Sequence, residues 1–234
     1  MVRKKKKNNL KVTRQLVTFY NPKSHISEQY RSIRTNLQFA SVDKSLTTLV
    51  ITSAGPAEGK SLTAANVAAT FAQQGKKVLL VDADLRKPTV HFTFHVENTN
   101  GLSNYLIGEH NLKECIVRST AANLSIVTSG PIPPNPSEIL SSKKMQQFVA
   151  EAKAEFDLLI FDSPPVLAVT DPAILSKMCD GVLLVVRSKS TEYEEAIKAK
   201  EQLEQVKANI LGVVLNDRDQ KKKEYYYYYG KGQK

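Results

Sequence analysis

The sequence predicts an α/β fold, a doubly wound and mainly parallel sheet, and three observations lead to this class. Short apolar runs alternate with helical stretches along the chain. The runs are apolar throughout, as expected of parallel strands that are covered on both faces. One run leads through a glycine-containing loop into a helix. Ligands bind beyond the carboxyl ends of the strands in such sheets, so we expect the functional residues there.

The expected elements follow in chain order. Tyr30, Ile33 and Leu37 have helical spacing, which predicts an amphipathic helix from about Ser27. Further helices are predicted over 60–74, before Gly75, and around 142–156 and 191–207. Strands are predicted over 47–54, 76–84, 123–130, 156–164, 181–188 and 210–217.

The net charge of +10 lies at the two ends of the chain. Residues 1–14 carry seven basic and no acidic side chains, and residues 218–234 carry six basic and two acidic ones. This division predicts a basic flexible arm over 1–26, a folded domain over 27–217 and a flexible Lys- and Tyr-rich tail over 218–234. The near-neutral body has no base-stacking motif, which argues against nucleic acid as a partner.

Cysteine content and hydropathy bear on the compartment. The two cysteines, Cys115 and Cys179, form no disulfide framework, and no secretory signal is present. This favours a reducing, cytoplasmic setting. The longest apolar runs are far shorter than the roughly 20 residues that span a bilayer, so the chain is expected not to cross a membrane by itself.

The loop "AGPAEGKS" carries the strongest local signal. Ala54-x4-Gly59-Lys60-Ser61 matches the phosphate-binding loop, or P-loop, in its form with alanine at the first position. Lys60 is expected to reach the terminal phosphates of a nucleoside triphosphate, and the Ser61 hydroxyl to ligate Mg2+. The alternative is a chance turn with a helix-capping serine. The strand–loop–helix context argues against this alternative. The predicted nucleotide-binding residues here are Ala54, Gly55, Pro56, Ala57, Glu58, Gly59, Lys60, Ser61 and Leu62.

Three aspartates follow apolar runs. Asp82 and Asp84 lie two residues apart, so on a continuing strand both would face one way. Asp162 ends another run, a position typical of a carboxylate that holds a metal ion or its waters. One such aspartate is often a turn or cap residue. Three of them beside a phosphate loop favour one metal and catalytic cluster.

Three segments together, "TSAGPAEGKS", "DADLRKP" and "FDSPP", resemble the bacterial tyrosine kinases (BY-kinases) of capsular and extracellular polysaccharide clusters. The resemblance covers nearly the whole chain, and it includes "SEQYRSIRTN", "PIPPNPSEIL" and a tyrosine cluster. The motifs of eukaryotic kinases are absent from the sequence. The resemblance implies a P-loop NTPase fold, ATP and Mg2+ as cofactors, and transfer of phosphate to protein tyrosines in control of polysaccharide synthesis and export.

Residue roles follow from the resemblance. Lys60, Asp82 and Asp84 are implied to be catalytic, with Asp82 the candidate base. Ser61, Asp84 and Asp162 are implied to hold the metal. The division of roles between Asp82 and Asp84 stays open.

Two further implied roles have plainer alternatives. Glu28, Arg31 and Arg34 correspond to an element that joins subunits of a ring; the alternative is a surface helix with weak ion pairs. Asn216 lies where relatives in the wider fold read the adenine; the alternative is a plain turn.

The resemblance also implies partners. We expect a separate transmembrane adaptor that activates the chain at the inner face of the cell membrane, a homo-oligomeric ring, a cognate phosphotyrosine phosphatase and protein substrates. The basic arm could bind an anionic leaflet or serve as a solubilising tail.

The tyrosine cluster is the expected site of autophosphorylation, at Tyr225, Tyr226, Tyr227, Tyr228 and Tyr229. Residues 218–229 span up to roughly 40 Å when extended, enough to reach a neighbouring subunit's site. Phosphorylation would turn the basic tail acidic.

A second function class is a ParA/MinD-like switch ATPase that acts on a membrane or DNA surface. Its phosphate loop carries an extra lysine near the start, where this chain has Gly55. The missing lysine favours the kinase interpretation.

Overall fold

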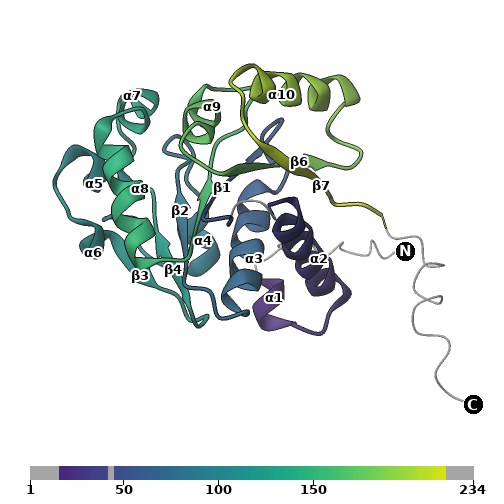
Figure 1. The fold of residues 1–234 in the computed structure, drawn as a ribbon, viewed down its shortest axis with the longest axis horizontal. Coiled ribbons are helices and arrows are strands. Elements are labelled where there is room, and N and C mark those ends of the chain that lie inside the picture. The colour runs from purple at the N-terminus through teal and green to yellow at the C-terminus, as the bar shows by residue number, and fades with distance from the viewer. Residues whose placement is uncertain (1–15, 42–44, 220–234) are drawn as a thin grey trace, which may run out of the picture.

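The structure, a computed structural model, describes residues 16–41 and 45–219. At its centre is a seven-stranded sheet in the order β3-β4-β2-β5-β1-β6-β7 (Figure 1). The strands are β1 Thr48–Ser53, β2 Val78–Asp82, β3 Ile116–Arg118, β4 Leu124–Val127, β5 Leu158–Asp162, β6 Gly181–Arg187 and β7 Ile210–Asn216. Neighbouring strands are parallel except β3 and β4. The predicted fold class is confirmed; β3 was not predicted, because its three partly exposed residues form no apolar run.

Helices cover both faces of the sheet (Figure 1). One face is covered by α1 Val17–Tyr20, α2 His25–Ala40, α3 Lys60–Ala72 and α4 Val90–Phe94. The other is covered by α5 Leu102–Ile107, α6 Leu112–Cys115, α7 Pro136–Leu140, α8 Lys143–Glu155, α9 Asp171–Ser176 and α10 Tyr193–Gln205. Alternate strand residues enter opposite cores: Val50 packs in one, Leu49 and Ile51 in the other. This two-sided burial explains why the strand sequences are apolar throughout.

The amino end of the folded domain differs from the prediction. Helix α2 begins at His25, because the Ser24 hydroxyl accepts the Ser27 N–H at 3.2 Å and caps the helix. Residues 16–26, which the sequence assigned to the arm, include α1. There the backbone N–H and the hydroxyl of buried Thr18 both donate to Asn66 on α3.

The remaining predicted helices are confirmed as α3, α8 and α10. The chain leaves α3 through Gly75, whose φ of +91° is in the left-handed region that favours glycine. Within residues 16–41 and 45–219, no helix is long and apolar enough to cross a membrane.

Asp180 joins the amino ends of β1 and β6. Its Oδ2 accepts the backbone N–H groups of Thr47 and Thr48, both at 2.9 Å, and the Thr47 hydroxyl at 2.7 Å. Burial raises the pKa of this carboxyl, but the hydrogen bonds from Thr47 and Thr48 outweigh burial and hold the pKa below its usual value.

We expect Asp180→Ala to lower the free energy of unfolding by about 1–3 kcal/mol near neutral pH, because three donors lose their acceptor. Since the folded-state pKa is lowered, this contribution is present above the unfolded pKa and is lost as pH falls through the folded pKa. Urea unfolding of both proteins at about pH 7 and about pH 3 measures the difference, which should narrow in acid. Asp157→Ala is the control, because exposed Asp157 accepts only the Lys77 N–H. An equal loss in the control, or a difference unchanged by pH, would contradict this account.

Candidate phosphate and metal site

The predicted phosphate loop lies at the carboxyl end of β1, a central strand flanked by β5 and β6. Ala57 and Gly59 in the loop have positive φ values of 61° and 91°. Left-handed residues in such loops gather successive backbone N–H groups into an anion-binding concavity. Helix α3 then begins at Lys60, with Gly59 at its N-cap. The predicted strand–loop–helix arrangement is confirmed, and its geometry suits phosphate.

Lys60 points its ammonium group into a cluster of oxygens. Nζ lies 2.8 Å from Asp84 Oδ2, 3.5 Å from Asp162 Oδ1 and 3.3 Å from the Ser61 hydroxyl. The Lys60 side chain is only 11% exposed. Burial alone would lower its pKa, but the Asp162 and Asp84 charges outweigh burial and raise the pKa above its usual value. Lys60 is therefore a buried ammonium whose charge is stabilised by the two carboxylates.

Asp82 and Asp162 face each other in register at the ends of β2 and β5. Both are fully buried. Burial, and next the charge of Asp162, raise the pKa of Asp82 to about 8. Burial also raises the pKa of Asp162, against the opposing effect of Lys60. The structure thus brings together the aspartates that the sequence predicted, in a setting that favours protonation of one of them.

The expectation that Asp82 and Asp84 lie on one continuing strand is wrong. β2 ends at Asp82, so Asp84 is not on a continuing strand. Instead the chain turns, and Asp84 reaches the cluster through its bond to Lys60. Asp82 holds this turn in place, because Oδ2 accepts the N–H groups of Thr89 and Val90 at 3.0 and 2.9 Å.

Asn216 is at the phosphate loop. Its Nδ2 donates to the Glu58 carbonyl at 2.9 Å. Nearby, Arg187 donates to the Ala57 carbonyl at 3.2 Å, and the Thr191 hydroxyl bonds the Glu58 carboxylate. These contacts join β7 and the end of β6 to the loop, so they fix its shape from the side. Contact with adenine stays a prediction for Asn216.

A second supporting network was missed by the sequence analysis. Buried Asp171 receives Nε and Nη2 of Arg86 at 2.9 and 3.1 Å, and the Ser137 hydroxyl at 2.6 Å. Three segments far apart in the sequence meet here, and no local spacing reveals it. The "PIPPNPSEIL" loop, which contributes Ser137, was the one available signal. The network anchors the turn that carries Asp84.

The predicted oligomer contacts lie on α2. Arg31 pairs with Glu28 and also donates to the Pro22 carbonyl at 2.6 Å. Arg34 donates to the Thr70 carbonyl on α3 at 3.0 Å. Each therefore has a partner within its own chain. Residues Tyr225–Tyr229 lie outside the described residues.

The cluster fits Mg2+ shared with a phosphate. Asp162 Oδ2 is buried and has no hydrogen-bond partner, so one ligand oxygen is available. The Asp84 carboxylate and the Ser61 hydroxyl add the hard oxygen ligands that this ion takes. Within the described part of the chain, no group of three His, Cys, Asp or Glu residues is arranged to hold a metal by itself. The missing ligands would then be phosphate oxygens and water.

Comparison with known proteins defines the class and then the family. The AAA domain family matches residues 47–211, which contain the phosphate loop and the aspartate cluster. The chain is also 51% identical over 214 residues to the tyrosine-protein kinase YwqD of Bacillus subtilis, over 92% of this chain and 90% of that protein. It belongs to the bacterial tyrosine-protein kinases.

Solved structures agree with this assignment to the bacterial tyrosine-protein kinases. The chimerical protein CapA2B2 is 41% identical with a TM-score of 0.85, over 88% of this chain and 90% of that one. The kinase domain of Escherichia coli tyrosine kinase ETK is 37% identical with a TM-score of 0.83, over 88% and 82%. The family resemblance stated from the sequence motifs is therefore confirmed.

The switch ATPases share the fold alone. The septum site-determining protein MinD of Pyrococcus horikoshii, complexed with Mg-ADP, is 22% identical with a TM-score of 0.62, over 77% of this chain and 76% of that one. The sequence likeness to kinases is much stronger, so the second function class is the weaker one.

The packing of Gly59 against Asn216 gives a stability test of the loop. A Cβ on Gly59 would overlap the Asn216 amide, and the residue also has positive φ. We expect Gly59→Ala to lower the free energy of unfolding by about 2–3 kcal/mol, from left-handed strain and the lost Asn216 hydrogen bond.

Gly75 is the matched control, because it has the same φ with nothing within 4 Å of an added Cβ. Gly75→Ala should lower the free energy of unfolding by the left-handed strain alone, about 1–2 kcal/mol. In an Asn216→Ala background, Gly59→Ala should lower the free energy of unfolding by less than it does in the wild type. Equal losses at both glycines, or no relief in that background, would show by urea unfolding that Asn216 does not support the loop.

Proposed function

We propose that this chain is an ATP-dependent protein tyrosine kinase that autophosphorylates Tyr225–Tyr229 and phosphorylates other proteins, and so regulates capsular or extracellular polysaccharide synthesis and export. The observation that carries the proposal is the Lys60 ammonium between Asp84 and Asp162 beside a phosphate loop. Membership of the bacterial tyrosine-protein kinases supports tyrosine as the acceptor.

The loop residues divide the work of binding ATP. The backbone of residues 54–62 surrounds the phosphates, and Lys60 supplies positive charge to the terminal ones. Ser61, Asp84 and Asp162 would hold Mg2+, which when bound neutralises charge on the phosphate oxygens. Asn216 would fix the loop from β7 and contact the base.

Proton transfer falls to the aspartate cluster. The tyrosine oxygen attacks the terminal phosphorus, the bond to the bridging oxygen breaks, and ADP leaves. The hydroxyl proton passes to Asp82, the buried carboxylate that ends β2 opposite Asp162. Asp84, which is bonded to Lys60, is the second candidate for this role.

We further propose a transmembrane adaptor, a ring of identical subunits and a cognate phosphatase, with the chain in the cytoplasm at the inner face of the membrane. The match to the E. coli tyrosine-protein kinase etk covers 84% of this chain but only 27% of that protein. Most of etk therefore lies outside the matched kinase segment, which supports a further protein as the partner of this chain. The likeness to the chimerical protein CapA2B2 also supports a partner protein, which we propose is a separate chain.

We expect Lys60→Met to abolish transfer of labelled phosphate from ATP, because the terminal phosphates lose their cation. The variant should stay folded by circular dichroism, and Lys153→Met on the exposed face of α8 is the control. Continued labelling of a folded Lys60→Met protein would remove the phosphate loop from the mechanism.

Phosphosite mapping separates the two function classes. With ATP, Mg2+ and the adaptor's cytoplasmic segment, a kinase places label on Tyr225–Tyr229, whereas a switch ATPase releases phosphate alone. Phosphate release without any phosphotyrosine would favour the switch ATPase.

Replacement of Glu28, Arg31 and Arg34 by Ala should shift the assembled species to monomer in analytical ultracentrifugation. Arg34 also bonds its own chain, so a thermal midpoint is measured beside it to separate assembly from folding. The control replaces exposed residues of α10, namely Glu194, Lys198 and Glu201. An unchanged oligomer would exclude α2 as the interface.

A further inference from the structure

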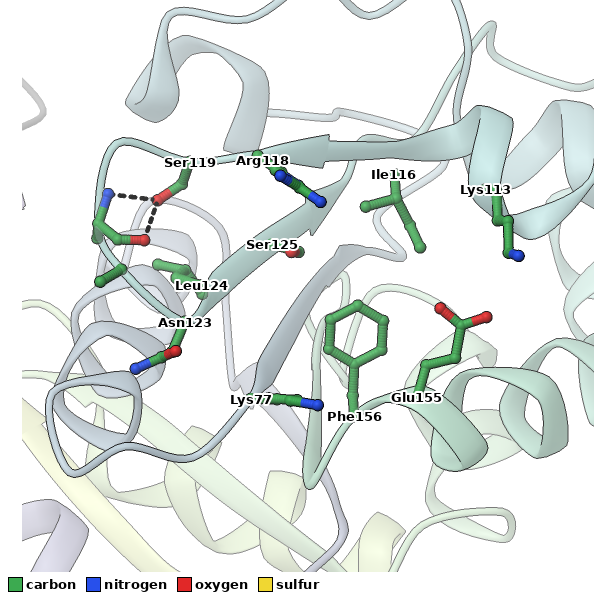
Figure 2. Close-up of a pocket in the computed structure, with 12 residues that line it drawn as sticks. Lys77, Lys113, Ile116, Arg118, Ser119, Asn123, Leu124, Ser125, Glu155 and Phe156 are labelled. Carbon is green, nitrogen blue, oxygen red and sulfur yellow. Dashed lines mark hydrogen bonds between the residues drawn. The ribbon is translucent and has the colours of Figure 1, made fainter.

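A cavity of about 700 Å³ lies beside the amino ends of β2 and β5, at the sheet edge formed by β3 and β4 (Figure 2). Asp82 and Asp162 stand at the opposite ends of β2 and β5. The length of these strands, about 16 Å, separates the cavity from the phosphate loop. The cavity is therefore a second place, of a size that accepts a ligand, outside the nucleotide site.

The lining of this cavity is basic. Lys77, Lys113 and Arg118 line it, against the single carboxylate of Glu155. All three cations are exposed. Within the described residues, none of the three takes part in an ion pair. Their positive charge is thus available to an anionic ligand.

An apolar wall accompanies the charges. Figure 2 shows the Phe156 ring pointing into the cavity from the segment after α8, towards the side of β3 that carries Ile116 and Arg118. Phe156 and Ile116 are partly buried and pack against the core, which holds them in place. An aromatic ring packs well on such a wall, while a phosphate attached to it binds the cations. The combination suits an aryl phosphate.

We propose that this cavity binds a phosphotyrosine from the phosphorylated tail of a second copy of this chain, an inference that rests on the proposed kinase function. Each phosphate adds about −1.5 to −2 charges, so phosphorylation of Tyr225–Tyr229 gives a strongly acidic segment that complements the three cations. A cavity of this volume accepts a single inserted side chain together with its phosphate.

The arrangement of the sheet favours a second copy as the donor. The tail follows β7, and β7 and β3 are the two opposite edges of the sheet. The cavity also lies beside the amino ends of β2 and β5, whereas the tail follows the carboxyl end of β7. A tail of the same molecule would have to cross the full width of the sheet as well as its length to reach the cavity, so the arrangement favours a second copy as the donor.

Binding is tested with a synthetic, fluorescent peptide of residues 218–234 that carries phosphotyrosine at Tyr225–Tyr229. The receptor is the full chain with these tyrosines replaced by Phe, so that its own tail does not compete. By fluorescence anisotropy the phosphopeptide should bind at least ten-fold more tightly than the unmodified peptide. Because the peptide is synthetic, this result does not depend on kinase activity, and equal binding of both peptides would overturn the pocket while leaving the proposed function standing.

Variants locate the binding. Lys113→Glu with Arg118→Glu should weaken phosphopeptide binding at least ten-fold, and Phe156→Leu should weaken it while keeping an apolar core contact. Lys177→Glu with Lys198→Glu makes the same charge change at exposed lysines elsewhere and should leave binding unchanged. An equal loss in this control would show unspecific charge attraction and overturn the proposal.

Two other probes separate the remaining ligand classes. A peptide with Glu in place of the five tyrosines should bind at least ten-fold more weakly than the phosphopeptide; equal binding would show an acidic-peptide site and overturn the aryl phosphate. The variant with Lys113→Glu and Arg118→Glu should co-sediment with phosphatidylserine-containing vesicles to the same extent as the parent protein. Loss of vesicle binding with unchanged phosphopeptide binding would make the cavity a membrane contact instead.

Discussion

The contact of one ammonium group with two buried carboxylates determines the layout of the site. Lys60 begins α3, Asp162 ends β5, and Asp84 lies in the turn after β2. The three meet because β2, β5 and β1 are adjacent parallel strands whose carboxyl ends lie side by side. Removal of one member of a buried ion pair commonly costs about 3–5 kcal/mol, since the other charge stays buried. The surrounding contacts hold this cluster: Asp82 fixes the turn, and Asp171 binds Arg86 within it.

The sequence predicted the features that local pattern encodes. Strands buried on both faces are apolar throughout, and the phosphate loop is one continuous segment, so both could be read directly. Asp84 was grouped with Asp82 for a wrong reason, because a strand's end cannot be located from two residues. Contacts such as that of Asn216 with the Glu58 carbonyl join distant segments and carry no local signal. The start of the domain was placed late because α1 is a single four-residue turn, which is too short to show a helical period in the sequence.

The two ends of the sheet differ in chemistry. The carboxyl ends gather a phosphate loop and three aspartates, which suits phosphoryl transfer with Mg2+. The amino ends of β2 and β5 lie beside a basic cavity with an aromatic wall, which suits the product of that transfer. The proposed phosphotyrosine pocket therefore leaves the nucleotide site free. Arg31 and Arg34 each donate to a carbonyl of their own chain, so both contacts hold α2 against neighbouring segments of the fold.

The central claim is that Lys60 is the counter-charge of Asp84 and Asp162. A double-mutant cycle by urea unfolding measures this directly: Lys60→Met is compared in the wild type and in a background with Asp84→Asn and Asp162→Asn. The account predicts that Lys60→Met lowers the free energy of unfolding by about 3–5 kcal/mol in the wild type. In the background without the two carboxylates, the same substitution should lower it by less than about 1 kcal/mol. Equal losses in both would contradict it.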